Sequence, residues 1–158
     1  MKIEILSRQQ LMIRAENPFS DNTALISITD PDREDVVLKY LPKHILRLKF
    51  EDVGDEIYEE ILGRIPTPRE QRQIEEQYRM FSSIQSQMTA DFLMQLGGKA
   101  DTLICQCEYG QSRSAAVAAA ILEYSRQKGI SVFSDSRYYP NKLVFRKLLS
   151  ALRTQGHQ

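Results

Sequence analysis

The chain has 158 residues, of which 42% are hydrophobic and 27% are charged, a composition typical of one globular domain over residues 1–158. Its 21 lysines and arginines balance 21 aspartates and glutamates, which excludes an overall field that would draw the protein to nucleic acid or to anionic lipid. No apolar run approaches the ~20 residues that span a bilayer, so we expect a soluble, cytoplasmic protein with no nucleic-acid or membrane partner.

The first half of the chain alternates predicted strands with loops and one short helix. Strands are expected at residues 2–6, 23–28 and 44–50, and the helix follows the first of them. The turn signal TDPD, residues 29–32, comes directly after the second strand, and a polar loop beginning at Glu51 follows the third.

The clearest predicted helix runs from about Thr67 to Leu96 as one element. Thr67 is its N-cap, Pro68 takes the first helical position, and Glu70 completes a capping box. Apolar residues recur along it at three- and four-residue steps, a stripe that is typical of core packing. These residues are Ile74, Tyr78, Phe81, Ile84, Met88, Phe92 and Leu96.

The second half of the chain contains a strand at 102–107, an Ala-rich helix at 112–129 and a last helix at 140–153. Cys105 and Cys107 would share one face of that strand, too close in sequence for a stable disulfide, so we expect both to be reduced. Strands alternating with helices predict an α/β fold, with a central, mostly parallel, twisted sheet of about four or five strands flanked by helices.

The stretch CEYGQSRS, residues 107–114, lies where the predicted strand turns into the Ala-rich helix. Such a loop directs backbone N–H groups and a helix N-terminus at one point, an arrangement that binds an oxyanion such as phosphate. Gly110 permits backbone conformations closed to other residues, and Arg113 offers a planar fork for two phosphate oxygens. A thiolate of Cys107 at the centre of this field would be a nucleophile, and Ser114 adds a hydroxyl that can hydrogen-bond it.

This stretch resembles the phosphate-binding loop of the cysteine-dependent protein tyrosine and dual-specificity phosphatases, in which a cysteine, five residues, an arginine and a serine or threonine follow one another. Cys107, Gly110, Arg113 and Ser114 match that pattern. The resemblance implies a tyrosine-phosphatase-like fold and catalytic roles for Cys107, Arg113 and Ser114. The residues that it assigns to phosphate binding are Glu108, Tyr109, Gly110, Gln111, Ser112 and Arg113.

The same family carries its general acid as an aspartate on a separate loop. Residues 50–53, Phe-Glu-Asp-Val, resemble the F-x-D element of bacterial relatives, so Asp52 is the first candidate for this acid and Asp55 is the second. Residues 137–141 resemble a Tyr-x-Pro-Asn segment of the same group, in which Asn141 would brace the phosphate loop or cap the last helix.

The resemblance implies hydrolysis of a phosphorylated protein or a small phosphoester through a phosphocysteine, without a cofactor or a metal. Neither His44 nor His157 belongs to a ligand cluster in the sequence. Two alternatives stay open. One is a catalytically silent domain that binds phosphorylated partners, which Gln106 favours because many family members have a histidine there. The other is a rhodanese-like sulfurtransferase, which also places a cysteine in an anion-binding loop before a helix. The sequence leaves the physiological substrate and the oligomeric state open.

Overall fold

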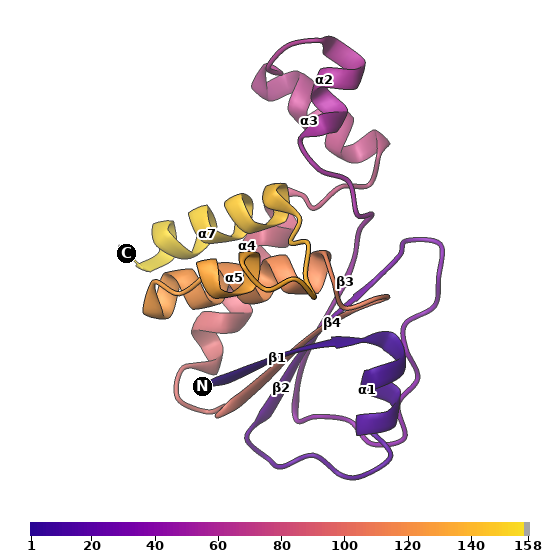
Figure 1. Ribbon diagram of the computed structural model, residues 1–158, viewed down its shortest axis with the longest axis vertical. Helices are drawn as coiled ribbons and strands as arrows, with labels where there is room; N and C mark the ends of the chain where they lie inside the picture. Colours follow the sequence, from indigo (N-terminus) through magenta and orange to yellow (C-terminus); the bar gives the residue numbers. More distant parts are fainter. Residues whose placement is uncertain (157–158) are drawn as a thin grey trace.

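The computed structural model describes residues 1–156, so His157 lies outside the described residues. Its centre is a four-stranded sheet with the strand order β1-β4-β2-β3, in which every neighbouring pair is parallel. The strands are β1 (Lys2–Ser7), β2 (Thr23–Thr29), β3 (His44–Lys49) and β4 (Thr102–Cys107). The predicted α/β fold with a central parallel sheet is therefore confirmed (Figure 1).

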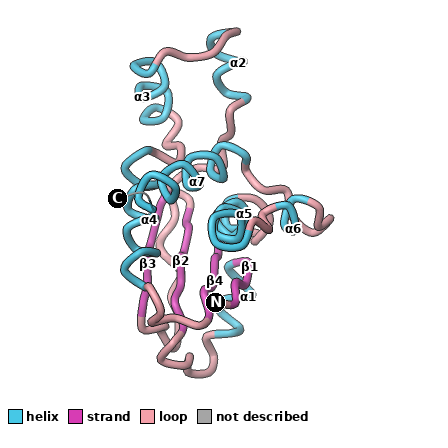
Figure 2. Tube along the Cα trace, turned by 90° about the vertical axis from the view of Figure 1, so that its left-hand side faces the viewer, coloured by secondary structure: helices cyan, strands magenta, loops and turns pink. Residues whose placement is uncertain are grey.

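Seven helices are present in the described part of the chain. They are α1 (Arg8–Arg14), α2 (Glu56–Leu62), α3 (Pro68–Gln77), α4 (Ser83–Leu96), α5 (Arg113–Arg126), α6 (Ile130–Phe133) and α7 (Lys142–Gly156). Helices α4, α5 and α7 cover one face of the sheet, and α1 covers the other (Figures 1 and 2). Residues 56–77, which carry α2 and α3 and which we call the arm, stand away from these layers. Within residues 1–156, no helix combines the length and the apolar character that a membrane crossing requires.

The side chains of the two inner strands alternate between the two faces of the sheet, as the geometry of a strand requires. Leu25 of β2 and Ile104 of β4 pack with Leu11 of α1. The alternate positions belong to the larger core under α4, α5 and α7, and both cysteines, which are free and buried, are among them. These positions are Ala24, Ile26, Ile28, Leu103, Cys105 and Cys107.

The single long helix expected from Thr67 to Leu96 is wrong, because the chain leaves the helical conformation between α3 and α4. Arg79 in this break has a φ of 50°, in the left-handed region that ends a helix. Ser82 then starts α4 with its own capping box, in which its hydroxyl accepts a hydrogen bond from the backbone N–H of Gln85 at 3.1 Å. The capping box predicted at Thr67 is confirmed at the start of α3.

The break also changes which residues of the predicted stripe reach the core. Ile74 and Phe81 are buried, whereas Ile84 is 75% exposed and Met88 is 44% exposed. The residues after the break belong to a helix with a different phase, so the apolar spacing no longer faces one side.

A buried ion pair joins the arm to the helical layer. Lys147 Nζ of α7 contacts the carboxylate of Glu75 in α3, and both side chains are less than 10% exposed, at 9% and 7%. The same ammonium donates to the carbonyl oxygen of Phe81 at 3.0 Å, and Gln71 Nε2 donates to Glu75 Oε1 at 3.3 Å. The Glu75 carboxylate is therefore held by partners from two helices.

Replacing Lys147 by methionine is expected to lower the free energy of unfolding by about 3–5 kcal/mol, because the Glu75 carboxylate is left buried without its cation. Chemical denaturation of the variant and the wild type measures this loss. The double variant Lys147→Met/Glu75→Leu should recover most of it, since both charges are then removed. A double variant less stable than Lys147→Met alone would contradict the assignment of the loss to an unpaired charge.

Candidate active site

The motif residues lie at the carboxyl end of β4, an inner strand of the sheet. Cys107 is the last residue of β4 and Arg113 is the first residue of α5, so the intervening loop joins a strand end to a helix N-terminus, as predicted. Ligands of parallel sheets bind at this edge, where helix N-termini and loops meet. The local geometry is therefore that of an anion-binding loop.

Cys107 and Ser114 are in direct contact. Cys107 Sγ lies 3.0 Å from Ser114 Oγ, and both residues are buried, with exposures of 2% and 0%. A hydroxyl at this distance can donate a hydrogen bond to a thiolate. The predicted role for Ser114, stabilising sulfur as a leaving group, requires this contact.

The first half of the loop, residues 108–110, contacts the junction of β1 and α1. The backbone N–H of Arg8 donates to the carbonyl of Glu108 at 3.1 Å, and the Glu108 carboxylate forms an ion pair with Arg33 at 2.6 Å. Gly110 has a φ of 67°, and a Cβ there would lie 2.7 Å from the backbone nitrogen of Ser7. Both the conformation and the close approach exclude a side chain, so this position requires glycine. The Glu108 side chain is bound to Arg33.

The Arg113 guanidinium is held by two loops that are distant in sequence. Its side chain is 6% exposed, and its Nη1 donates to Asp30 Oδ1 at 2.6 Å and to the Phe50 carbonyl oxygen at 2.9 Å. These bonds fix the arginine and leave Nε and Nη2 as donors for an anion. The contribution of Asp30 was missed in the sequence, although the TDPD turn directly after a buried strand signals a carboxylate at this edge of the sheet.

Asp52 lies against the phosphate loop. Its Oδ1 accepts hydrogen bonds from Ser112 Oγ at 2.8 Å and from Asn141 Nδ2 at 2.9 Å. The loop that follows β3 thus brings a carboxylate next to the residues between Cys107 and Arg113. A hollow of about 380 Å³ opens beside Asp52 and Ser112 and is lined also by Tyr139.

Asn141 connects three segments of the site. Its Nδ2 also donates to the Val53 carbonyl at 3.2 Å, and its backbone N–H donates to the Ser112 carbonyl at 3.2 Å. Its Oδ1 accepts from the backbone N–H groups of Leu143 and Val144 at 3.0 and 3.2 Å, which caps the start of α7. The two roles expected for Asn141, bracing the phosphate loop and capping the last helix, are therefore both present.

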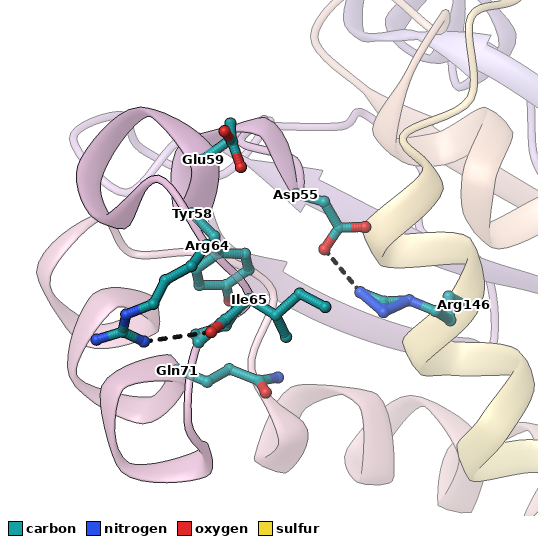
Figure 3. Close-up of a pocket in the computed structure, with 8 residues that line it drawn as sticks. Asp55, Tyr58, Glu59, Arg64, Ile65, Gln71 and Arg146 are labelled. Atoms are coloured by element: carbon teal, nitrogen blue, oxygen red, sulfur yellow. Dashed lines mark hydrogen bonds and ion pairs between the residues drawn. The ribbon is translucent and has the colours of Figure 1, made fainter.

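Asp55, the second candidate for the acid, has a different partner. Its Oδ1 accepts from Arg146 Nη2 of α7 at 2.7 Å. It lines the hollow beside Asp52 and also a pocket of about 380 Å³ between the arm and α7, together with Tyr58 and Ile65 (Figure 3). Of the two candidates, Asp52 is thus the one whose carboxylate is hydrogen-bonded to the loop between Cys107 and Arg113.

Gln106 occupies the position before Cys107 and is fully buried. Its Oε1 accepts from Ser27 Oγ at 2.5 Å, and its Nε2 donates to the carbonyl oxygen of Cys107 at 3.0 Å. The glutamine therefore holds the backbone of Cys107. Within residues 1–156, no three or more His, Cys, Asp or Glu side chains are grouped to hold a metal ion.

Comparison with known proteins defines the class of fold to which this site belongs. No model of a protein family matches the chain, and no curated protein matches it. Solved structures do match, and this chain shares the fold of PTPMT1, which agrees with the tyrosine-phosphatase-like fold that the resemblance implies.

Three of these structures illustrate the match. PTPMT1, solved in complex with PI(5)P, is 12% identical, with a TM-score of 0.51 over 99% of this chain and 93% of its own. Human DUSP28 is 14% identical, with a TM-score of 0.49 over 99% and 94%. A mouse dual-specificity phosphatase complexed with zinc tungstate is 17% identical, with a TM-score of 0.48 over 96% and 82%. At these identities the likeness concerns the fold alone.

Proposed function

We propose that the protein hydrolyses phosphomonoesters through a phosphocysteine on Cys107. The observation that carries this proposal is the convergence of three groups at one edge of the sheet. They are a buried thiol with a hydroxyl 3.0 Å away, a buried arginine at the start of α5, and the Asp52 carboxylate, which accepts a hydrogen bond from the loop between them. The shared fold supports the same assignment.

In the first step, the Cys107 thiolate attacks phosphorus in line with the bond to the leaving oxygen. The S–P bond forms as the ester P–O bond breaks, and Asp52 gives its proton to the departing oxygen. Arg113 and the loop N–H groups neutralise charge on the non-bridging oxygens, where electrostatic stabilisation is worth most. The products of this step are an alcohol or phenol and the phosphocysteine.

In the second step, the Asp52 carboxylate takes a proton from a water molecule, whose oxygen attacks phosphorus. The S–P bond breaks, the electron pair returns to sulfur, and the Ser114 hydroxyl donates to the resulting thiolate. Inorganic phosphate leaves, and Asp52 is again protonated for the next turnover.

The hydrogen bonds around Asp52 support different roles for its two oxygens in this mechanism. Among the described residues, Ser112 and Asn141 both donate to Oδ1, at 2.8 and 2.9 Å. Oδ2 is then the oxygen that carries and transfers the proton. The two donors keep the carboxyl group oriented while its protonation state changes between the steps.

The substrate that we propose is a phosphorylated protein or a small phosphoester, handled as by a protein tyrosine or dual-specificity phosphatase. The hollow beside Asp52 is the site that we assign to the leaving group, because Asp52 lines it. Tyr109 in the loop and Tyr139 beside it are 77% and 71% exposed, which gives the rim of the site two aromatic side chains. Such side chains offer large contact areas to a substrate.

The wild-type protein is expected to release phosphate from p-nitrophenyl phosphate in the presence of EDTA, since the chain's own donors supply the positive potential. Acid quenching during turnover should trap a phosphoryl group on Cys107, which mass spectrometry of the peptide identifies. Binding of a phosphopeptide without phosphate release would contradict the proposal and favour a silent binding domain. A persulfide on Cys107 after incubation with thiosulfate would instead favour sulfur transfer.

A further inference from the structure

Arg79 occupies the break between α3 and α4 in a backbone conformation that residues with a side chain rarely adopt. Its φ is 50°, and its carbonyl oxygen accepts a hydrogen bond from the backbone N–H of Glu51 at 2.7 Å. Such a conformation persists only where surrounding contacts hold it, and it is often found near functional sites. The backbone bond attaches Arg79 to the loop that carries Asp52.

The Arg79 side chain binds two loops at once. Its guanidinium donates to both carboxylate oxygens of Asp32, at 2.8 and 3.0 Å, and to Glu51 Oε1 at 3.0 Å. Asp32 follows β2 and Glu51 follows β3, and these two strands are parallel neighbours. The bonds from Arg79 hold the pKa of Asp32 below its usual value.

The same two loops hold the arginine of the site. Asp30, two residues before Asp32, accepts from Arg113 Nη1, and so does the carbonyl oxygen of Phe50, which precedes Glu51. The position of Arg113 therefore depends on the separation of these loops, which Arg79 bridges from outside.

We propose that Arg79 is a positioning residue for the phosphatase reaction: its guanidinium joins the loops after β2 and β3 and thereby sets the positions of Arg113 and Asp52. The inference rests on the proposed function, because it assigns those two residues their roles. Arg79 acts through Asp32 and Glu51 and touches none of the reacting groups.

The ion pair of Arg79 and Asp32 is exposed, so its effect on catalysis can be distinguished from its effect on stability. The side chains of Arg79 and Asp32 are 47% and 77% exposed, and ion pairs at such exposure contribute little to folding. Loss of the Arg79 side chain should therefore change catalysis more than it changes the unfolding transition.

The test compares Arg79→Asn with Arg64→Asn. Asparagine tolerates the left-handed conformation, so Arg79→Asn removes the guanidinium and retains the helix break. Arg64 is a matched control, because it binds both oxygens of Glu70 at 2.8 and 2.7 Å and is 55% exposed, but it lies in the arm. We expect Arg79→Asn to lower kcat for p-nitrophenyl phosphate about tenfold and to weaken vanadate inhibition, because Arg113 is displaced. Arg64→Asn should match the wild type in both, and the two variants should unfold at similar temperatures.

Two further variants test whether the effect passes through the loops. Arg79→Lys keeps the charge but cannot form the fork, so it should recover only part of the activity. Asp32→Asn should lower kcat in the same direction, and its effect should not add to that of Arg79→Asn, since both variants remove one interaction. Additive losses would overturn the bridge between the loops.

The outcomes distinguish failure of this inference from failure of the proposed function. If the wild type turns over substrate and Arg79→Asn does so equally well, the positioning role is wrong and the proposed function stands. If the wild type binds vanadate without turnover, calorimetry of vanadate binding tests the positioning role. Weaker binding by Arg79→Asn than by Arg64→Asn supports that role, and equal binding overturns it. A wild type that neither turns over substrate nor binds vanadate overturns both.

Discussion

Cys107→Ser is expected to abolish phosphate release from p-nitrophenyl phosphate, with a loss of about 10⁴-fold or more, while the affinity for phosphate and vanadate stays near that of the wild type. A serine hydroxyl at this position is not ionised at neutral pH and cannot form the phosphocysteine. The anion site itself is unchanged, because backbone N–H groups and the buried Arg113 side chain supply it. Steady-state kinetics and titration with vanadate measure the two effects separately.

Cys105→Ala is the matched control for this substitution. Cys105 is buried on the same face of β4, two residues before the nucleophile, and burial raises the pKa of its thiol. A thiol that stays protonated is no nucleophile, so this variant should retain turnover, with some loss of stability from the smaller side chain. Full activity of Cys107→Ser would refute the assignment of the nucleophile.

Asp52→Asn is expected to lower kcat by about 10²–10³-fold for esters with poor leaving groups and only slightly for those with good ones. A poor leaving group needs a proton in the transition state, whereas a stable phenolate departs without one. The asparagine oxygen can still accept the hydrogen bonds that Ser112 and Asn141 donate to Asp52 Oδ1, so the loop should keep its place. A series of aryl and alkyl phosphates, with kcat plotted against the pKa of the leaving group, should give a steeper slope for the variant.

Asp55→Asn is the control on the same loop. Its carboxylate is bound to Arg146 at 2.7 Å and not to the phosphate loop, so the slope of that plot should equal that of the wild type. A steeper slope for Asp55→Asn together with a wild-type slope for Asp52→Asn would show that the acid had been assigned to the wrong carboxylate.

The elements that could be predicted from the sequence are those with a local signal. The alternation in β1, the buried run of β4 and the capping box at Thr67 each lie within a few residues and were read correctly. The break at Arg79 could not be read in this way, because apolar residues continue at helical spacing on both sides of it. The contacts that hold Arg79 come from Asp32 and Glu51, which are distant in sequence. The short helices α2 and α6 were not predicted, because neither carries a long apolar stripe.

The candidate site likewise has residues that a local motif identifies and residues that only distant contacts bring in. Cys107, Gly110, Arg113 and Ser114 fall within eight consecutive residues, so one motif identifies them together. Asp30 is 83 residues from Arg113, and only the parallel pairing of β2 with β4 shows that its strand ends beside the phosphate loop. Contacts of this range depend on strand order, which residue spacing does not reveal.

Gln106 places a side chain that does not change its charge with pH directly before Cys107. Many cysteine-dependent phosphatases, which the motif of this chain resembles, have a histidine before the nucleophile, and its imidazole changes its charge between about pH 5 and 8. Here the Gln106 side chain accepts a hydrogen bond from Ser27 and donates one to the carbonyl oxygen of Cys107. Its amide group stays neutral throughout that pH interval. The side chain next to Cys107 on the strand therefore adds no charge to the site at any pH in that interval.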